Sequence, residues 1–241
     1  MIKSPESCSF HWKQKPVPGE DRVTDYPICL NKLHRTQCVV VGGGAVAERK
    51  VRSLLEAQAM VRIVSPQLTE GLQELADQGL VQHIPRPYRM GDLEGAFLTI
   101  AATDDRATNC TVSEEAESRQ SLVNVVDAPE FCNFTVPAVL RRGSLVISIS
   151  TEGQSPALAA HVREQLESVI GPEYVTLTEI LGGLRDYVIE ACPVKHRRTL
   201  WSRLIDSNVL DLLREGQPQI ARDRAKQIVD SYVSSVAVSS N

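Results

Sequence analysis

The sequence predicts an α/β protein: a Rossmann-type doubly wound parallel sheet, followed by a small dimerisation segment and a helical C-terminal domain. Three observations support this prediction. Short β-branched runs alternate with stretches of helical periodicity from about residue 26 to about residue 135. A triple glycine stands where the first of these runs meets the first helical stretch. After about residue 172 the strand-like runs cease and helical periodicity dominates.

The first part of the chain contains a leader and then five expected strands. Residues 1–25 are polar, contain three prolines and show no periodicity, so we predict a disordered leader. Residues 26–135 alternate between strand and helix, which implies right-handed crossovers and one parallel sheet. We therefore predict an NAD-binding Rossmann domain over this range. The expected strands are 37–41, 61–64, 81–85, 97–102 and 122–126, and the expected helices are 45–58, 68–78 and 109–118.

The rest of the chain divides into two predicted parts. Residues 144–150 alternate as a strand does, and a lone strand cannot satisfy its own backbone groups. We therefore predict a dimerisation segment over 136–171, where this strand finds a partner sheet, with a second subunit as one candidate. An amphipathic helix is expected at 157–168, and a helical domain at 172–241. Breaks in the helical domain are expected at Gly182–Gly183, Pro193 and Gly216.

Length and composition exclude several classes of protein. The 241 residues, 42% of them hydrophobic, allow one or two domains with a buried core. The net charge of -4 argues against a nucleic-acid partner. No apolar run approaches the roughly 18 residues that span a bilayer, and the first 25 residues lack the apolar core of a secretory signal. The cysteines and histidines form no CxxC, HxxxH or HExxH pattern. We therefore predict a cytoplasmic protein with no nucleic-acid or membrane partner and no metal ligands.

The glycine-rich turn follows the G-x-G-x-x-A pattern between a strand and a helix. Gly42 suits a tight turn, Gly44 allows a pyrophosphate to approach the backbone, and the small Ala47 allows close helix packing. The N–H groups at the start of the helix would then face the anion. Two interpretations remain open, a dinucleotide site and a merely structural turn.

The expected acidic residue about 20 positions further on, which would bind the ribose, is missing. The second strand ends in Ser65, Pro66 and Gln67 without a carboxylate, and the Ser65 hydroxyl and the backbone of residues 66–67 offer weaker hydrogen bonds. We choose NAD as the cofactor and leave NADP open. The residues after the last two strands, Thr103, Asp104 and Asp127, should face the same crevice, because ligands of open parallel sheets lie beyond the carboxyl ends of the strands. The alternatives are a helix N-cap for the Thr-Asp-Asp run and a simple turn for Asp127.

Four ordered motifs together resemble the precorrin-2 dehydrogenase family, which includes the amino-terminal module of multifunctional sirohaem synthases. They are VVGGGAVAERK at 40–50, AATDD at 101–105, NVVDAP at 124–129 and SISTEGQSPAL at 148–158. The resemblance covers about residues 26–205. It implies a homodimer that oxidises precorrin-2 to sirohydrochlorin with NAD in sirohaem biosynthesis, with the helical domain at 172–241 covering the substrate. Some family members also insert ferrous iron, so ferrochelatase activity stays open.

The resemblance also implies roles for particular residues. Asp127 matches the family's essential acid/base group, and a small residue is usual at the end of the second strand, which accounts for the missing carboxylate. Thr151 stands where some members have a phosphorylated serine, but the sequence that follows departs from the family's, so we do not expect its phosphorylation. Family contacts to NAD correspond to Ala45, Val46, Pro66 and Gln67.

The substrate that the resemblance implies carries eight carboxylates, so cationic groups should surround it. Arg141, Arg142 and Arg163 are the candidates, because a guanidinium can hold a carboxylate through two hydrogen bonds. Solvated surface charges are the alternative for each of them. A different class of function also stays open, a non-catalytic NAD(H)-sensing module, since a fold alone does not determine function.

Overall fold

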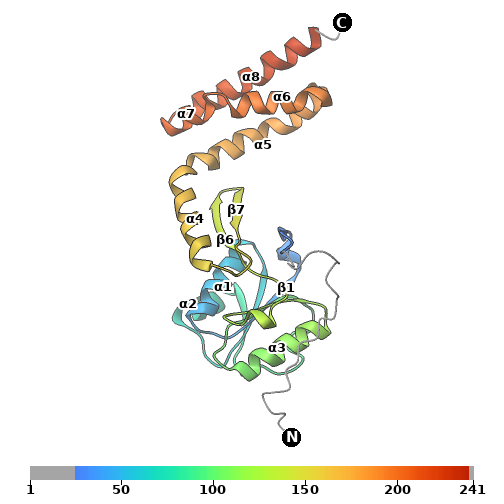
Figure 1. The fold of residues 1–241 in the computed structure, drawn as a ribbon, viewed down its shortest axis with the longest axis vertical. Helices are drawn as coiled ribbons and strands as arrows, with labels where there is room; N and C mark the ends of the chain where they lie inside the picture. The colour runs from blue at the N-terminus through green and yellow to red at the C-terminus, as the bar shows by residue number, and fades with distance from the viewer. Residues whose placement is uncertain (1–24, 239–241) are drawn as a thin grey trace. The chain divides into compact units, whose positions relative to one another are not determined.

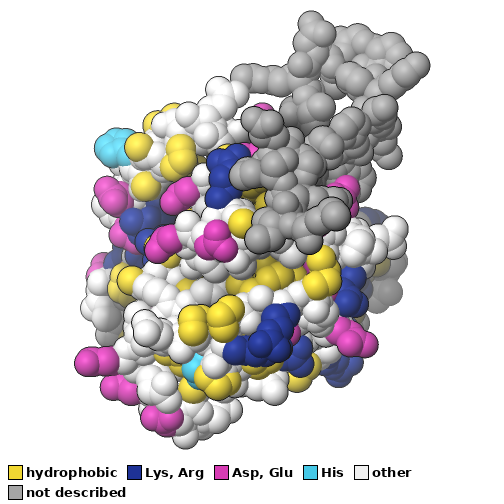
Figure 2. All heavy atoms as spheres, turned by 90° about the horizontal axis from the view of Figure 1, so that it is seen from below, with side chains coloured by type: hydrophobic (Ala, Val, Ile, Leu, Met, Phe, Trp, Pro, Cys, Tyr) yellow, Lys and Arg dark blue, Asp and Glu magenta, His cyan; other side chains and the backbone are white. Residues whose placement is uncertain are grey.

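The computed structural model describes residues 25–238, and the predicted leader lies outside this range except for residue 25. The chain divides between Val136 and Pro137 into two compact units (Figure 1). Among the described helices none is both long enough and apolar enough to cross a membrane. On the face shown in Figure 2, acidic and basic side chains are interspersed with apolar ones, in keeping with a net charge of only -4.

The first unit contains a five-stranded parallel sheet in the order β3-β2-β1-β4-β5. Its central strand, β1, pairs Val41 with Val64 of β2 and with Ala101 of β4, so that the carboxyl ends of these strands meet at one edge. This confirms the predicted Rossmann-type sheet. The strands are β1 (Gln37–Val41), β2 (Met60–Val64), β3 (Val81–Ile84), β4 (Ala96–Ala101) and β5 (Leu122–Val125).

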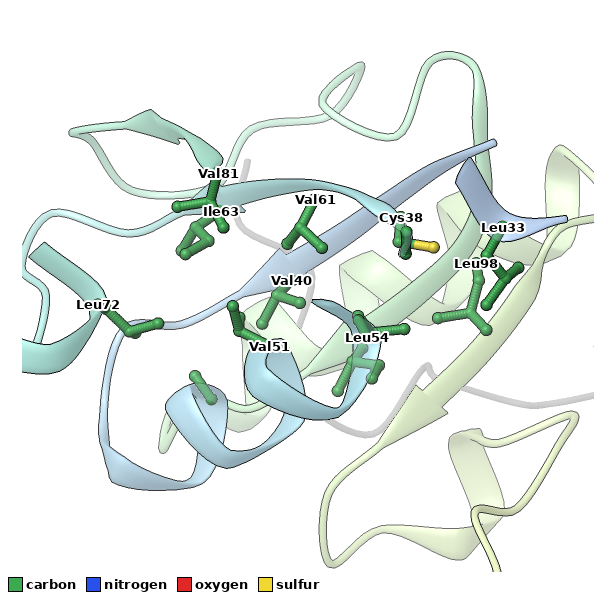
Figure 3. Close-up of a cluster of buried hydrophobic side chains, with 13 residues drawn as sticks. Leu33, Cys38, Val40, Val51, Leu54, Val61, Ile63, Leu72, Val81 and Leu98 are labelled. Atoms are coloured by element: carbon green, nitrogen blue, oxygen red, sulfur yellow. The ribbon is translucent and has the colours of Figure 1, made fainter. Parts of the chain in front are cut away.

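Two apolar clusters cover the two faces of the sheet. Cys38 and Val40 of β1 belong to the cluster shared with α1 (Ala45–Glu56) and α2 (Glu70–Asp77), which Figure 3 shows. Val39 and Val41 of the same strand point into the cluster shared with α3 (Arg106–Ser118). Successive residues of a strand face opposite sides, so a strand buried on both faces is apolar throughout.

Two of the first unit's helices begin at side-chain caps, whereas the helix after the glycine turn does not. Thr69 accepts a hydrogen bond from Leu72 N in α2, and Asp105 accepts from Ala107 N and Thr108 N in α3. The cap at Asp105 makes α3 begin three residues before its predicted start. Gly44 precedes α1 and has no side chain to offer, so the first N–H groups of this helix keep their capacity to bind an anion.

The second unit begins with a hairpin that corrects one prediction. The strand expected at 144–150 is β7 (Leu145–Ile149), and it pairs antiparallel with β6 (Ala138–Arg142) of the same chain. Gly143 makes the turn with φ of 58°. The partner was missed because Arg141 and Arg142 interrupt the apolar alternation of β6. α4 (Pro156–Val169) packs against this hairpin.

Four helices follow and share one apolar cluster. The break predicted at Gly182–Gly183 is wrong, since α5 continues through it. Two glycines cost a helix about 2 kcal/mol, and the burial of Leu177, Ile180 and Val188 along α5 offsets that cost. Pro193 and Gly216 do separate helices as predicted. The four helices are α5 (Glu173–Ala191), α6 (Val194–Ile205), α7 (Val209–Arg214) and α8 (Pro218–Val238).

Candidate functional site

A cavity of about 690 Å³ opens at the edge of the sheet where the carboxyl ends of β1, β2, β4 and β5 meet. Loops from all four strands line it, which is the place where open parallel sheets bind ligands. Of the predicted site residues, only Gln67 and the three arginines are not in its lining. The predicted residues that line the cavity are Gly42, Gly44, Ala45, Val46, Ser65, Pro66, Thr103, Asp104 and Asp127.

The three glycines of the turn have different structural roles. Gly42 has φ of +119°, and a Cβ there would lie 2.2 Å from the carbonyl oxygen of Ala102. A Cβ on Gly43 would lie 2.0 Å from the carbonyl oxygen of Gln67. Gly44 has no atom within 4 Å of such a Cβ and faces the cavity. The first two glycines thus permit close backbone packing, and the third leaves open space beside the start of α1, where a pyrophosphate fits.

The wall beyond β2 is formed by uncharged groups. Ser65 is buried, and its hydroxyl donates to the carbonyl oxygen of Gln67 at 2.7 Å, which fixes the loop. Pro87 and Tyr88 complete this wall. No lysine or arginine is among the cavity's lining residues, all of which lie within the described part of the chain. A ribose hydroxyl fits this wall, whereas a 2′-phosphate would have no cation to bind.

Tyr88 is hydrogen-bonded to a buried carboxylate. Its hydroxyl donates to Glu115 of α3, which also accepts from Gly91 N at 2.9 Å, Leu93 N at 3.3 Å and Arg119 Nε at 2.7 Å. Burial raises the pKa of Glu115, but the hydrogen bonds from Tyr88, Gly91 and Arg119 outweigh it, and the net pKa is lowered. Glu115 is therefore ionised at neutral pH and anchors the loop between β3 and β4.

The same loop has a second anchor. Asp92 accepts from Arg86 through both carboxylate oxygens, at 2.6 and 2.7 Å, and from Arg89 N at 2.8 Å. The hydrogen bonds from Arg86 lower the pKa of Asp92. Arg86 stands next to Pro87 of the wall, and Asp92 engages its guanidinium. The sequence indicates a turn at Gly91–Asp92–Leu93, but no motif in residues 85–95 predicts that this loop forms part of the cavity wall.

The Thr-Asp-Asp run divides between two roles. Asp105 is the N-cap of α3, and a hydrogen bond from the Thr108 hydroxyl is the main cause of its lowered pKa. The hydroxyl of Thr103 donates to Asn109 Oδ1 at 2.8 Å, and the Asn109 amide donates back to Thr103 O at 3.0 Å. Asp104 lines the cavity beside them. The N-cap interpretation thus holds for Asp105, although all three residues line the cavity.

Asp127 lies two residues after the end of β5 with φ of 57°, a left-handed conformation that is uncommon for a residue with a side chain. Hydrogen bonds on both sides fix its backbone, from Val126 N to Ala101 O at 2.9 Å and from Ala128 N to Val125 O at 3.3 Å. Its side chain is exposed and faces the cavity. A carboxylate held in this way can accept a proton from a ligand next to the glycine turn.

The predicted arginines belong to the second unit. Arg142 donates to Ile170 O at 2.9 Å, and Arg163 forms a salt bridge with Glu167 at 2.5 Å, while Arg141 is exposed. Two of the three therefore already have partners within that unit. Thr151 accepts a hydrogen bond from Ser155 N at 3.0 Å. Across residues 25–238, no group of three or more His, Cys, Asp or Glu side chains is placed to hold a metal ion.

Three consecutive family models match the chain. They describe a putative NAD(P)-binding domain at residues 29–138, the sirohaem biosynthesis protein central region at 142–168 and the sirohaem synthase dimerisation region at 173–228. These matches confirm the predicted family and the predicted dinucleotide cofactor. They also place a dimerisation region further along the chain than the segment predicted from the lone strand.

Curated relatives and a solved structure agree with these models. The siroheme synthase of Photobacterium profundum is 36% identical over 208 residues, 86% of this chain and 44% of that protein. The siroheme synthase of Chromobacterium violaceum is 38% identical over 198 residues, 82% of this chain and 42% of that protein. The chain thus spans less than half the length of these relatives. The structure of SirC, a precorrin-2 dehydrogenase, shares the fold with a TM-score of 0.69 and 24% identity, over 86% of this chain and 100% of that one.

Proposed function

Because the chain belongs to the sirohaem synthase family, we propose that it is an NAD-dependent precorrin-2 dehydrogenase, which forms sirohydrochlorin for sirohaem biosynthesis. One structural observation supports the proposal in addition to family membership. The Asp127 carboxylate and the glycine turn line the same cavity. The oxidation removes a hydride and a proton from the substrate, so the site needs a hydride acceptor and a base close together.

Different residues of the chain bind the dinucleotide and accept the proton. The start of α1 and the turn at Gly44 bind the pyrophosphate, and the loop after β2 binds the ribose through Ser65 and backbone groups. The bound dinucleotide supplies the hydride acceptor. Asp127 accepts the proton, because its exposed carboxylate faces the cavity from a fixed backbone turn. The uncharged wall at Ser65, Pro66 and Tyr88 favours NAD over NADP.

We further propose that the chain acts as a homodimer. The match to a sirohaem synthase dimerisation region supports this proposal, and so do large apolar side chains exposed on its helices, at Tyr187, Ile189, Val194 and Ile205. The exposed Arg141 on β6 is the best remaining candidate for a substrate carboxylate, since Arg142 and Arg163 have partners of their own.

An anaerobic assay with precorrin-2 and NAD tests the proposed activity through NADH absorbance and the spectrum of the product. We expect turnover by the unaltered protein. We expect Asp127→Asn to lower kcat by roughly a hundredfold or more and to leave the Kd for NAD unchanged. Asp77→Asn, an exposed carboxylate at the end of α2, is the matched control and should keep full activity.

Three outcomes separate the alternatives. Tight NAD binding without consumption of precorrin-2 would refute the dehydrogenase and favour the NAD(H)-sensing module. Full activity of Asp127→Asn would remove Asp127 from the reaction. A parallel assay with sirohydrochlorin and ferrous iron tests metal insertion, and a rate equal to the uncatalysed background would refute it.

A further inference from the structure

Two segments of the first unit line the part of the cavity that the proposed function assigns to the dinucleotide. One is the glycine turn with the start of α1, residues 43–46, and the other is the loop after β2, which includes Ser65 and Pro66. The first would bind the pyrophosphate and the second the ribose. Because both groups belong to one ligand, affinity depends on how well the two segments are held in place relative to each other.

Backbone hydrogen bonds join the two segments on either side of the loop. Gly42 N donates to Val64 O at 3.0 Å, and Thr69 N donates to Gly43 O at 2.9 Å. The turn itself consists of glycines, so a side-chain contact from this segment to the loop has to come from α1.

Glu48 of α1 makes this contact. Its Oε2 accepts a hydrogen bond from the Thr69 hydroxyl at 2.5 Å, and its Oε1 accepts from Arg52 Nε at 2.9 Å and Nη2 at 2.6 Å. Glu48 lies one turn after Gly44, to whose carbonyl oxygen its own N–H donates at 2.9 Å. The Thr69 hydroxyl also accepts from Leu72 N as the cap of α2. A continuous series of hydrogen bonds therefore runs from the start of α1 to the start of α2.

The surroundings of Glu48 hold its carboxylate in place. The side chain is 22% exposed. Hydrogen bonds from Thr69 and then from Arg52 lower the pKa of Glu48, so the carboxylate is ionised at neutral pH. A Cβ on Gly71 of α2 would lie 2.3 Å from Glu48 Oε1 and 2.7 Å from Arg52 Nη2. The missing side chain at Gly71 thus leaves room for the carboxylate between the two helices.

The sign of its charge separates two ways in which Glu48 could act on a bound dinucleotide. A pyrophosphate at the start of α1 is an anion, and a carboxylate in the first turn of the same helix repels it. Through its charge alone, Glu48 would therefore weaken binding, although Arg52 compensates for part of that charge. Glu48 can strengthen binding only through the geometry that it imposes on the loop.

We propose that Glu48 and Thr69 are positioning residues for NAD, whose hydrogen bond fixes the loop after β2 against the glycine turn before the dinucleotide binds. This inference rests on the proposed function. Neither residue is in the cavity lining, so both act through the position of the loop. Without their bond the loop would have to be ordered when NAD binds, and that ordering lowers the affinity.

The first experiment measures the Kd for NAD by calorimetry, at a temperature where each variant is folded. Glu48→Ala should raise the Kd roughly tenfold, the size of effect that one hydrogen bond to a charged group can have. Glu48→Gln keeps an acceptor oxygen for Thr69 and should bind NAD almost as tightly as the unaltered protein. Glu56→Ala, an exposed position at the end of α1, is the matched control. Unchanged or tighter binding in Glu48→Ala would overturn the proposal.

The second experiment changes the other partner of the hydrogen bond. Thr69→Ser keeps the hydroxyl and should retain the Kd for NAD, whereas Thr69→Val removes it and should raise the Kd. The double variant of Glu48→Ala and Thr69→Val should bind no more weakly than Thr69→Val alone, because both substitutions remove the same bond. Losses that add in the double variant would contradict the pairing and overturn the proposal.

Steady-state kinetics separate positioning from a general loss of structure. With precorrin-2, Glu48→Ala should raise the KM for NAD and keep its kcat at saturating NAD, and a lowered kcat with an unchanged KM would overturn the proposal. If the unaltered protein binds NAD but does not oxidise precorrin-2, the proposed function fails, and calorimetry still decides the role of Glu48. If Glu48→Ala does not fold, the comparison of Thr69→Val with Thr69→Ser decides it.

Discussion

Replacing Glu115 by glutamine tests how the wall of the cavity at Tyr88 is held in place. The side chain of Glu115 is 2% exposed, and its two oxygens accept hydrogen bonds from four donors. A glutamine has one acceptor oxygen, and its NH₂ group would face donors where the second oxygen stood. Whichever way the glutamine amide is oriented, one of the two backbone amides, that of Gly91 or that of Leu93, would therefore lose its partner inside the protein.

The expected cost follows from the charge and exposure of these donors. A hydrogen bond to a charged group contributes about 1.5–3 kcal/mol, and an unsatisfied buried donor costs about 1–3 kcal/mol. Arg119 is partly exposed and can be solvated instead, so its loss adds little. We expect Glu115→Gln to lower the free energy of unfolding by about 2–3 kcal/mol. The Kd for NAD should rise, because Tyr88 lines the cavity.

The pH dependence of the stability loss tests whether the Glu115 carboxylate is its cause. Glu115 has a folded-state pKa below its ordinary 4.5, so its contribution is present above that value and is lost as pH falls through the folded-state pKa. Urea unfolding and exchange of the Gly91 amide, measured at about pH 7 and at about pH 3, should show a difference between the proteins that shrinks with acid. An equal difference at both pH values would refute this reasoning, and so would an equal loss in Glu117→Gln on the same helix.

Substitutions at four further positions test backbone packing, ligand binding, a buried hydroxyl and a helix cap. Gly43→Ala should unfold or strongly destabilise the first unit, because its Cβ would stand 2.0 Å from a carbonyl oxygen, and thermal unfolding measures this. Gly44→Ala should leave the melting temperature unchanged but weaken NAD binding in calorimetry, since its Cβ meets only open space in the cavity. Thr99→Val should stabilise the protein by about 1 kcal/mol in urea unfolding, because the buried Thr99 hydroxyl has no hydrogen-bond partner. Asp105→Ala should cost about 1 kcal/mol through loss of the α3 cap, and Asp105→Asn should recover most of it.

The parts of the fold that follow a local period could be predicted from the sequence. β1 is apolar throughout because both faces of the sheet are covered, and its alternate residues enter two different clusters. The strand β6 could not be found, since adjacent arginines obscure its alternation and only the pairing with β7 reveals it. The continuation of α5 through Gly182–Gly183 was also hidden, because tertiary burial outweighs the helix propensity of glycine.

The site, like the fold, could be predicted only in part from the sequence. Residues at the ends of strands, such as Thr103 and Asp127, could be placed in one crevice because parallel strands end at one edge. The Tyr88 wall could not, since it depends on a loop that reaches Glu115 across 27 positions of sequence.

The charged side chains of the cavity lie on one side of it. On the side of β2 the wall at Ser65, Pro66 and Tyr88 is uncharged, and the carboxylate of Glu115 that supports it is buried and fully paired. On the side of β4 and β5 the carboxylates of Asp104 and Asp127 face the cavity. Proton transfer needs a group that can change its charge at low cost, and an exposed carboxylate can do so, whereas one held by four donors cannot. We therefore infer that the reacting end of the ligand lies beside β4 and β5, and the adenosine end beside β2.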